Sequence, residues 1–201
     1  MKPIDDIRAL IPDFAKDVRL NLGTLLGAEG SPDLTADQKW GCALAAAIAA
    51  RNPLLTQAID DVAAFTIEEG VAEAARTAAA IMGITNIYYR AVHMAANPEL
   101  SARPAGLRMN GLAQHRIAPA DFELFGLAAS VVNGCEGCTR AHTDGALKHG
   151  ASILAVQTAL RIAAVIHATA AVLDVPDDTV SLRRPLSQSH LPQPQTIESA
   201  N

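Results

Sequence analysis

Short, sharply bounded alanine-rich segments are the feature that most constrains the fold of this chain. Thr35-Ala36-Asp37-Gln38 has the form of a capping box, in which the first and fourth side chains satisfy each other's backbone N–H groups. An alanine-rich segment follows to about Arg51 and ends at Asn52-Pro53, where a helix stops readily. Half of the residues are hydrophobic but only 3% are aromatic. This composition favours closely packed helices over a β-sandwich, which would use more Val, Thr, Tyr and Phe.

Similar signals predict helices elsewhere in the chain. Thr66-Ile67-Glu68-Glu69 repeats the capping pattern, Pro119 suits a first helical turn, and Ser152 suits an N-cap. Gly83 is interpreted as a stop. The predicted helices cover residues 36–51, 66–82, 84–95, 107–114, 121–133, 135–148 and 152–173. Since no segment alternates polar and apolar residues as a strand does, we predict an all-α fold.

The end of the chain differs from the rest. After Asp174, prolines recur among Ser and Gln with few apolar residues. Such a composition cannot bury enough apolar surface to order a chain. We therefore predict one helical domain over residues 1–174 and a disordered or loosely draped Pro/Ser/Gln-rich tail over residues 175–201. A weak internal echo also links residues 36–41 with residues 120–126, and it is open whether a duplication or chance produced it.

Charge and hydropathy narrow the class of protein. The net charge is −5 and no Lys/Arg block is present, which disfavours nucleic acid or an anionic membrane as a partner. The start of the chain carries Asp5 and Asp6 where a signal peptide needs an apolar core. The longest uncharged runs, residues 77–89, 124–135 and 162–173, are too short to span a bilayer. We expect a cytoplasmic protein.

Two of the three cysteines stand at C-x-x-C spacing, and a histidine follows. In a reducing compartment such a pair is more often catalytic or metal-bound than a structural crosslink. If Cys135 begins a helix, the Cα atoms of Cys135 and Cys138 lie about 5 Å apart, within disulfide range. His142 then lies one turn beyond Cys138 on the same face and can exchange a proton with its sulfur. The pattern favours thiol–disulfide chemistry.

Glu123 is a further candidate, twelve residues before Cys135 within an apolar run. It lies either on a solvated stripe or inside, where His142 is its natural partner for a proton relay.

Other interpretations of these residues stay open at this point. Zinc bound by Cys135, Cys138 and His142 would need a fourth ligand, and the thiols could also be inert on a buried face. Cys42 reads as a small core residue and His167 as a hydrogen-bonded core histidine. The remaining histidines read as surface residues: His93, His115, His149 and His190.

The chain resembles the alkyl hydroperoxide reductase D (AhpD) family, within the wider carboxymuconolactone-decarboxylase-like group. The central signature is C-x-x-C-x-x-x-H with a glutamate twelve residues upstream, here Cys135, Cys138, His142 and Glu123. Matching stretches run to about Asp174: Leu10-Ile11-Pro12, residues 16–22, Trp40-Gly41 through Arg51-Asn52-Pro53, residues 78–83, Asn86-Ile87-Tyr88-Tyr89-Arg90, residues 107–110 and Phe122-Glu123-Leu124.

The resemblance implies an all-helical homotrimer with weak peroxidase activity and no tightly bound cofactor. Its main role would be to reduce an oxidised partner peroxiredoxin, alkyl hydroperoxide reductase C. Electrons would come from a lipoyl group on a 2-oxoacid dehydrogenase component. Cys138 would attack the peroxide, Cys135 would form the disulfide, and His142 with Glu123 would relay protons. The alternative is a carboxymuconolactone-decarboxylase-like or zinc-binding protein with non-redox cysteines.

Two points qualify these roles. A thioredoxin-type argument would make the first cysteine, Cys135, the nucleophile because it is nearer the helix end, whereas the position of His142 favours Cys138. The family also carries a histidine immediately before the second cysteine, where this chain has Gly137. We expect a less acidic thiol and lower peroxidase activity as a result.

Overall fold

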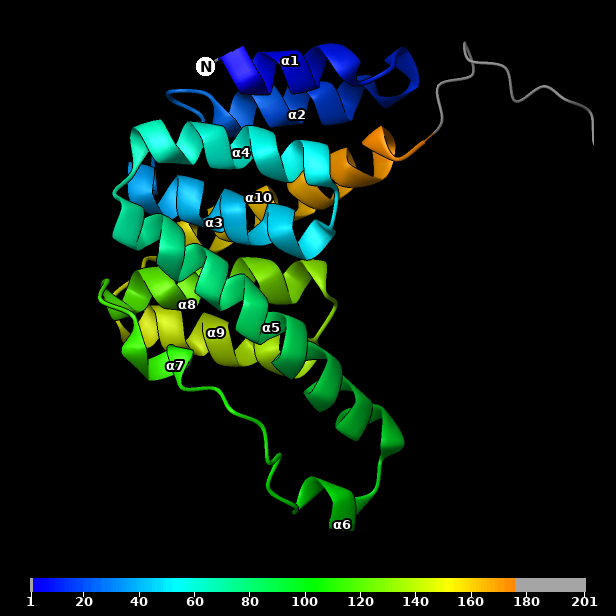
Figure 1. Ribbon diagram of the computed structural model, residues 1–201, viewed down its shortest axis with the longest axis vertical. Coiled ribbons are helices and arrows are strands. Elements are labelled where there is room, and N and C mark those ends of the chain that lie inside the picture. Colours follow the sequence, from blue (N-terminus) through cyan, green and yellow to red (C-terminus); the bar gives the residue numbers. More distant parts are fainter. Residues whose placement is uncertain (1, 176–201) are drawn as a thin grey trace, which may run out of the picture.

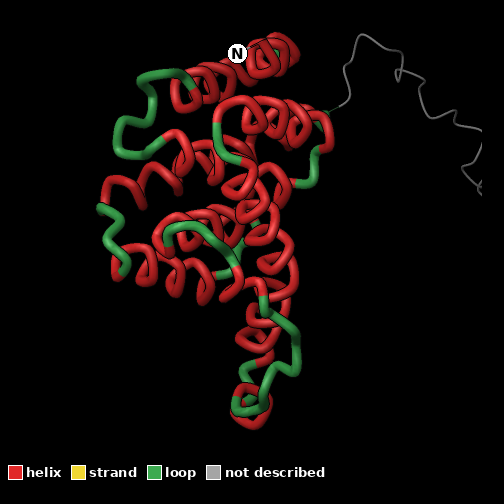
Figure 2. Tube along the Cα trace, turned by 60° about the vertical axis from the view of Figure 1, so that its left-hand side comes forward, coloured by secondary structure: helices red, strands yellow, loops and turns green. Residues whose placement is uncertain are grey.

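The computed structural model describes residues 2–175, and the predicted tail lies outside them except for Val175. The described part is helical with no strand, so the predicted all-α fold is confirmed (Figures 1 and 2). In chain order the elements are α1 (Lys2–Leu10), a 3-10 turn η1 (Asp13–Ala15), α2 (Lys16–Leu26), α3 (Ala36–Ala50), α4 (Pro53–Thr66), α5 (Glu69–Ala95), α6 (Pro98–Ser101), α7 (Gly111–Gln114), α8 (Pro119–Val132), α9 (Glu136–Lys148) and α10 (Ile153–Leu173).

The first capping box forms as predicted. Gln38 N donates to Thr35 Oγ1 over 3.2 Å, and Thr35 N donates to Gln38 Oε1 over 3.0 Å. Helix α3 ends at Ala50, and its C-cap Arg51 adopts a left-handed conformation with φ 64°. Asn52 then caps α4 by accepting a bond from Leu55 N over 2.9 Å.

The second predicted capping box and the stop at Gly83 are wrong. Thr66 is the last residue of α4, and its hydroxyl bonds Val62 O over 2.6 Å. Helix α5 begins at Glu69 and continues through Gly83 for 27 residues. A glycine inside a helix costs only about 1 kcal/mol, and the burial of neighbours such as Met82 offsets that cost. Helices α1, α2 and α4 were not predicted. For α4 the signal was present, since Asn52 is its N-cap and Pro53 its first residue, but Asn52-Pro53 was interpreted only as the end of the preceding helix.

Helix α3 occupies the centre of the molecule and packs against α4, α5, α8 and α10. It presents mostly alanines to these neighbours, which lets helices approach closely. Helix α8 packs in turn on α5 and α9, and Figure 1 shows these three helices together on the side away from α1 and α2. The face shared by α5, α8 and α9 holds the candidate site.

The second half of α5 leaves this body as an arm, with α6 at its tip and a loop returning to α7. The arm stands clear of the other helices in both views (Figures 1 and 2). It exposes large apolar side chains, which are Ile84, Ile87, Tyr89, Met94, Leu100 and Leu107.

Helix α10 is the one described helix that is long and apolar enough, by length and composition alone, to cross a membrane. The uncharged run 162–173 is too short by itself to cross a membrane. The helix is longer than this run, because it also includes Arg161 and residues 153–160. Half of its most apolar window is buried, against α2, α3, α8 and α9. Core helices of folded domains have the same character.

Candidate active site

The two spaced cysteines lie where α8 turns into α9. Gly134 has φ +66°, a left-handed conformation that glycine adopts without a side-chain clash. Cys135 is the N-cap of α9, and the backbone N–H of Cys138 donates to Cys135 Sγ over 3.4 Å. The sulfur therefore takes the place of the oxygen that usually caps a helix.

Both thiols are free and buried, with Cys135 2% exposed and Cys138 8% exposed. Cys135 also lines a surface hollow of about 480 Å³, together with Val131, Gly134, Glu136, Thr139 and Arg140. The hollow is therefore the side from which a second thiol can approach Cys135.

Burial raises the pKa of the Cys138 thiol to about 11. A hydrogen bond to Cys135 raises the pKa further, because it stabilises the protonated form, whereas the Asn86 amide opposes the shift by stabilising the thiolate. With such a pKa, the thiolate fraction at pH 7 is on the order of 10⁻⁴. Chemistry at Cys138 thus needs a group that accepts the thiol proton.

A carboxylate–imidazole pair lies one helical turn beyond Cys138. His142 Nδ1 and Glu123 Oε2 are 2.7 Å apart, and both side chains are largely shielded from solvent. Two glycines make room for this pair. A Cβ at Gly126 would lie 2.7 Å from the His142 ring, and a Cβ at Gly145 would lie 2.6 Å from the Glu123 carboxyl carbon. The contact with Glu123 fixes the Nδ1 edge of the ring, and Nε2 lies on the opposite edge.

His142 Nε2 faces Met82 Sδ at 3.1 Å. Within residues 2–175 no hydrogen bond joins His142 to Cys138, although the two share a face of α9. A thioether is only a weak acceptor. Met82 therefore packs against the Nε2 edge of the imidazole and helps to hold the ring in place.

A buried polar network from α5 and the end of α8 reaches Cys138 through Asn86. Asn86 Nδ2 donates to Ser130 Oγ over 3.0 Å, and Asn133 Nδ2 donates to Asn86 Oδ1 over 3.0 Å. Ser130 Oγ lies 3.3 Å from Met82 Sδ. Sequence reasoning gave Met82, Asn86 and Ser130 no role in the site. The available signal was a polar side chain inside an apolar helical run, since buried polar groups need partners.

Comparison with known proteins bears on this site. The carboxymuconolactone decarboxylase family model matches residues 98–175, a range that contains Glu123, Cys135, Cys138 and His142. Proteins named alkyl hydroperoxide reductase AhpD are similar over most of their length. The one from Anaeromyxobacter sp. is 48% identical over 87% of this chain and 92% of its own. That of Rhodospirillum centenum is 47% identical over 85% and 90%, and that of Bradyrhizobium sp. is 44% identical over 89% and 97%.

The chain belongs to the AhpD family.

The third cysteine of this AhpD-family chain, Cys42, belongs to the hydrophobic core. Cys42 is fully buried in α3, as predicted, and burial raises its pKa far above the usual range. Among the described histidines, His93 and His149 are on the surface as expected. The interpretation of His115 as a surface residue is wrong, because its ring is half-buried and stacks on Phe122 with ring centroids 4.1 Å apart. His190 lies outside the described residues.

The interpretation of His167 as a core histidine is wrong. Its side chain is exposed and lines a pocket, because the position falls on the outer face of α10. Over residues 2–175, no three His, Cys, Asp or Glu side chains gather in a way that could hold a metal ion.

Proposed function

We propose that this AhpD-family protein is a dithiol-dependent antioxidant enzyme that reduces alkyl hydroperoxides. The observation that carries the proposal is the placement of two free thiols at the start of α9, one turn from the Glu123–His142 pair. Thiol pair, proton acceptor and oriented carboxylate are the groups that peroxide reduction by cysteine requires. The names of the similar proteins support the same reaction.

In the first step, the Cys138 proton passes to His142 and the thiolate attacks the terminal peroxide oxygen. A sulfur–oxygen bond forms, the oxygen–oxygen bond breaks, and the leaving alkoxide takes a proton to become an alcohol. Cys138 is then a sulfenic acid. The raised pKa of Cys138 is the reason that this step depends on a base, and the contact with Glu123 holds the imidazole in position.

In the second step, Cys135 attacks the sulfenic sulfur, a disulfide forms, and water leaves. The hollow at Cys135 suits attack on this sulfur by an external thiol. A reduced lipoyl dithiol, carried by a 2-oxoacid dehydrogenase component, would supply the two electrons that restore both thiols and would become a disulfide itself. No cofactor is tightly bound in this scheme. The same Cys135–Cys138 dithiol would regenerate an oxidised partner peroxiredoxin by disulfide exchange.

The proposal extends to assembly and location. The arm exposes apolar side chains from Ile84 to Leu107, and exposed apolar surface of this kind is typical of protein–protein contacts. We propose that the arms join copies of the chain into a homotrimer in the cytoplasm. Light scattering at micromolar concentration tests the assembly, and a monomer would contradict it.

The reaction is tested by NADH oxidation coupled through dihydrolipoamide dehydrogenase and lipoamide to an alkyl hydroperoxide. Cys135→Ser and Cys138→Ser should each abolish turnover, because a dithiol cycle needs both sulfurs. Cys42→Ser is the matched control and should retain the turnover of its folded fraction. Near wild-type turnover in either of the first two variants would overturn the cycle.

Thiol titration before and after one equivalent of hydroperoxide separates this proposal from a decarboxylase-like or zinc-binding protein. The redox enzyme should lose two thiols and form an intramolecular disulfide. Inert thiols, or thiols that hold stoichiometric zinc, would favour the alternative.

A further inference from the structure

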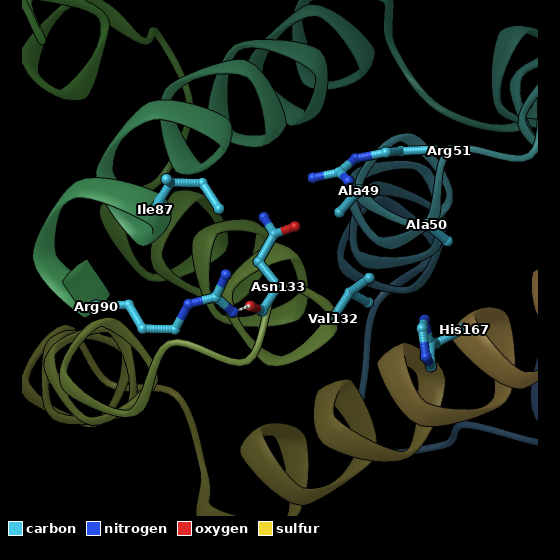
Figure 3. A pocket seen from close by; sticks show the side chains of 8 residues that line it. All are labelled: Ala49, Ala50, Arg51, Ile87, Arg90, Val132, Asn133 and His167. Carbon is cyan, nitrogen blue, oxygen red and sulfur yellow. Dashed lines mark hydrogen bonds between the residues drawn. The ribbon is translucent and has the colours of Figure 1, made fainter. Parts of the chain in front are cut away.

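A second pocket lies next to the loop that carries the cysteines, since Val132 and Asn133 line it. It has a volume of about 280 Å³ and is formed by the C-terminal ends of α3 and α8 with parts of α5 and α10. Its lining consists of Ala49, Ala50, Arg51, Ile87, Arg90, Val132, Asn133 and His167 (Figure 3). We call it the arginine pocket. Its size is at the lower end for ligand sites and suits a small polar head group.

The arginine pocket is lined by basic side chains and by no acidic ones. Arg51, Arg90 and His167 line it, and none of its lining residues is a carboxylate. The nearby carboxylate Asp174 is bonded to Asn52 Nδ2 over 2.8 Å and does not line the pocket. Guanidinium groups carry charge at all physiological pH values and bind carboxylates with paired hydrogen bonds. The lining therefore favours an anion.

Arg51 occupies an unusual backbone position for this purpose. Its φ of 64° is left-handed, a conformation that glycine or asparagine adopts more readily at a helix end. The conformation directs the side chain over the pocket, and Figure 3 shows its guanidinium extending toward the Asn133 side chain. Within the described part of the chain, Arg51 forms no salt bridge and no side-chain hydrogen bond. Its guanidinium is available to a ligand.

The arginine pocket is close to the thiols along the chain. Asn133 is two residues before Cys135, so their Cα atoms lie at most about 7 Å apart. Arg90 donates to the Asn133 carbonyl, as Figure 3 shows. The Asn133 amide bonds Asn86, which in turn stabilises the Cys138 thiolate. A ligand held at Arg51 and Arg90 would sit beside the reactive loop.

We propose that the arginine pocket binds the carboxylate of an organic ligand. Because the pocket adjoins the dithiol loop, the ligand is a carboxylate-bearing hydroperoxide, which the enzyme prefers over neutral hydroperoxides. This preference rests on the peroxidase function proposed above, whereas binding of the carboxylate does not.

Binding is measured first, with the full chain and a probe that cannot react. Hexanoate should bind to the reduced wild-type protein in a calorimetric or NMR titration, and hexanol should bind at least 10-fold more weakly. Arg51→Gln should weaken hexanoate binding by 10-fold or more, and Arg51→Lys should restore part of it. Arg161→Gln is the matched control, since it removes an exposed arginine of α10 that does not line the pocket. Absence of hexanoate binding, or equal binding by Arg51→Gln and wild type, would overturn the proposal.

Selectivity is measured second. The ratio of kcat/KM for a carboxylate-bearing hydroperoxide to that for cumene hydroperoxide should fall about 10-fold in Arg51→Gln and stay constant in Arg161→Gln. An unchanged ratio in Arg51→Gln would overturn the substrate preference. If the wild type reduces no hydroperoxide but hexanoate still binds through Arg51, the peroxidase function and the preference fail together, and the carboxylate site stands.

Discussion

Helices α3 and α8 pack against each other, and a glycine in each receives a ring from a neighbouring helix. A Cβ at Gly41 of α3 would lie 2.1 Å from the Phe125 ring, and a Cβ at Gly126 of α8 would lie 2.7 Å from the His142 ring. Phe125 is fully buried and apolar, so the first contact contributes packing. His142 is bonded to Glu123, so the second contact positions a titratable group.

The three cysteines show the same contrast between an apolar core and a polar site. Cys42 lies in the middle of α3, surrounded by the core. Cys135 and Cys138 lie at the start of α9, where one sulfur accepts a backbone N–H and the other has Asn86 as a polar partner. Glycine and cysteine therefore serve either the core or the site of this protein. The difference depends on whether the neighbouring helix places an apolar or a polar side chain against them.

The strongest test of this contrast removes the proton relay. His142→Gln and Glu123→Gln should each lower turnover by roughly 10²–10⁴-fold, the usual effect of removing a positioned acid or base. The measurement is steady-state peroxide reduction with lipoamide as donor. A loss below threefold in both variants would mean that the proton acceptor is elsewhere.

The two thiol environments should also respond differently to pH. The Cys138 pKa is raised to about 11, so its thiolate is scarce at pH 7 and its alkylation should quicken roughly tenfold per pH unit up to about pH 10. Cys42 is fully buried with a raised pKa and should stay unmodified in the folded protein. Iodoacetamide labelling with mass spectrometry of each site provides the rates. A plateau for Cys138 below pH 8 would contradict the expected shift.

Alanine at the two glycines compares the ring contacts directly. Gly126→Ala should displace the His142 imidazole and lower turnover about 10-fold, since small misplacements of a catalytic group are costly. Gly41→Ala should displace the Phe125 ring and lower the free energy of unfolding by about 1–3 kcal/mol, with unchanged turnover per folded molecule. Denaturant unfolding and turnover are measured on both variants. Equal turnover in the two would show that the Gly126 contact is only packing.

The smallest expected effect concerns Gly137. A Cβ at this position would meet no atom within 4 Å, so Gly137→His should fold without loss of stability. The imidazole would lie beside Cys138 and should lower its pKa and raise peroxide reduction a few-fold near neutral pH. Stopped-flow peroxide reduction against pH checks this. An unchanged pH profile would mean that His142 alone sets the reactivity.

Prediction from the sequence succeeded where the signals were local. The capping box at Thr35, the turn at Gly134 and the Ser152 cap correspond to observed helix starts or ends. The predicted helix end at Gly83 was wrong, because an exposed helical position tolerates glycine. The predicted burial of His167 was wrong, because which face of α10 is buried depends on the helices packed against it.

The sequence by itself determined the helical class, the family, and the spacing that places both cysteines and His142 along one short helix. These are properties of neighbouring residues, and caps and periodicity express them directly. Only the tertiary structure decided that Glu123 lies inside against His142, that Met82 and Asn86 complete the site, and that Arg51 and Arg90 share a pocket. The physical reason is that these contacts join helices up to 60 residues apart, and they depend on how α3, α5, α8 and α9 pack.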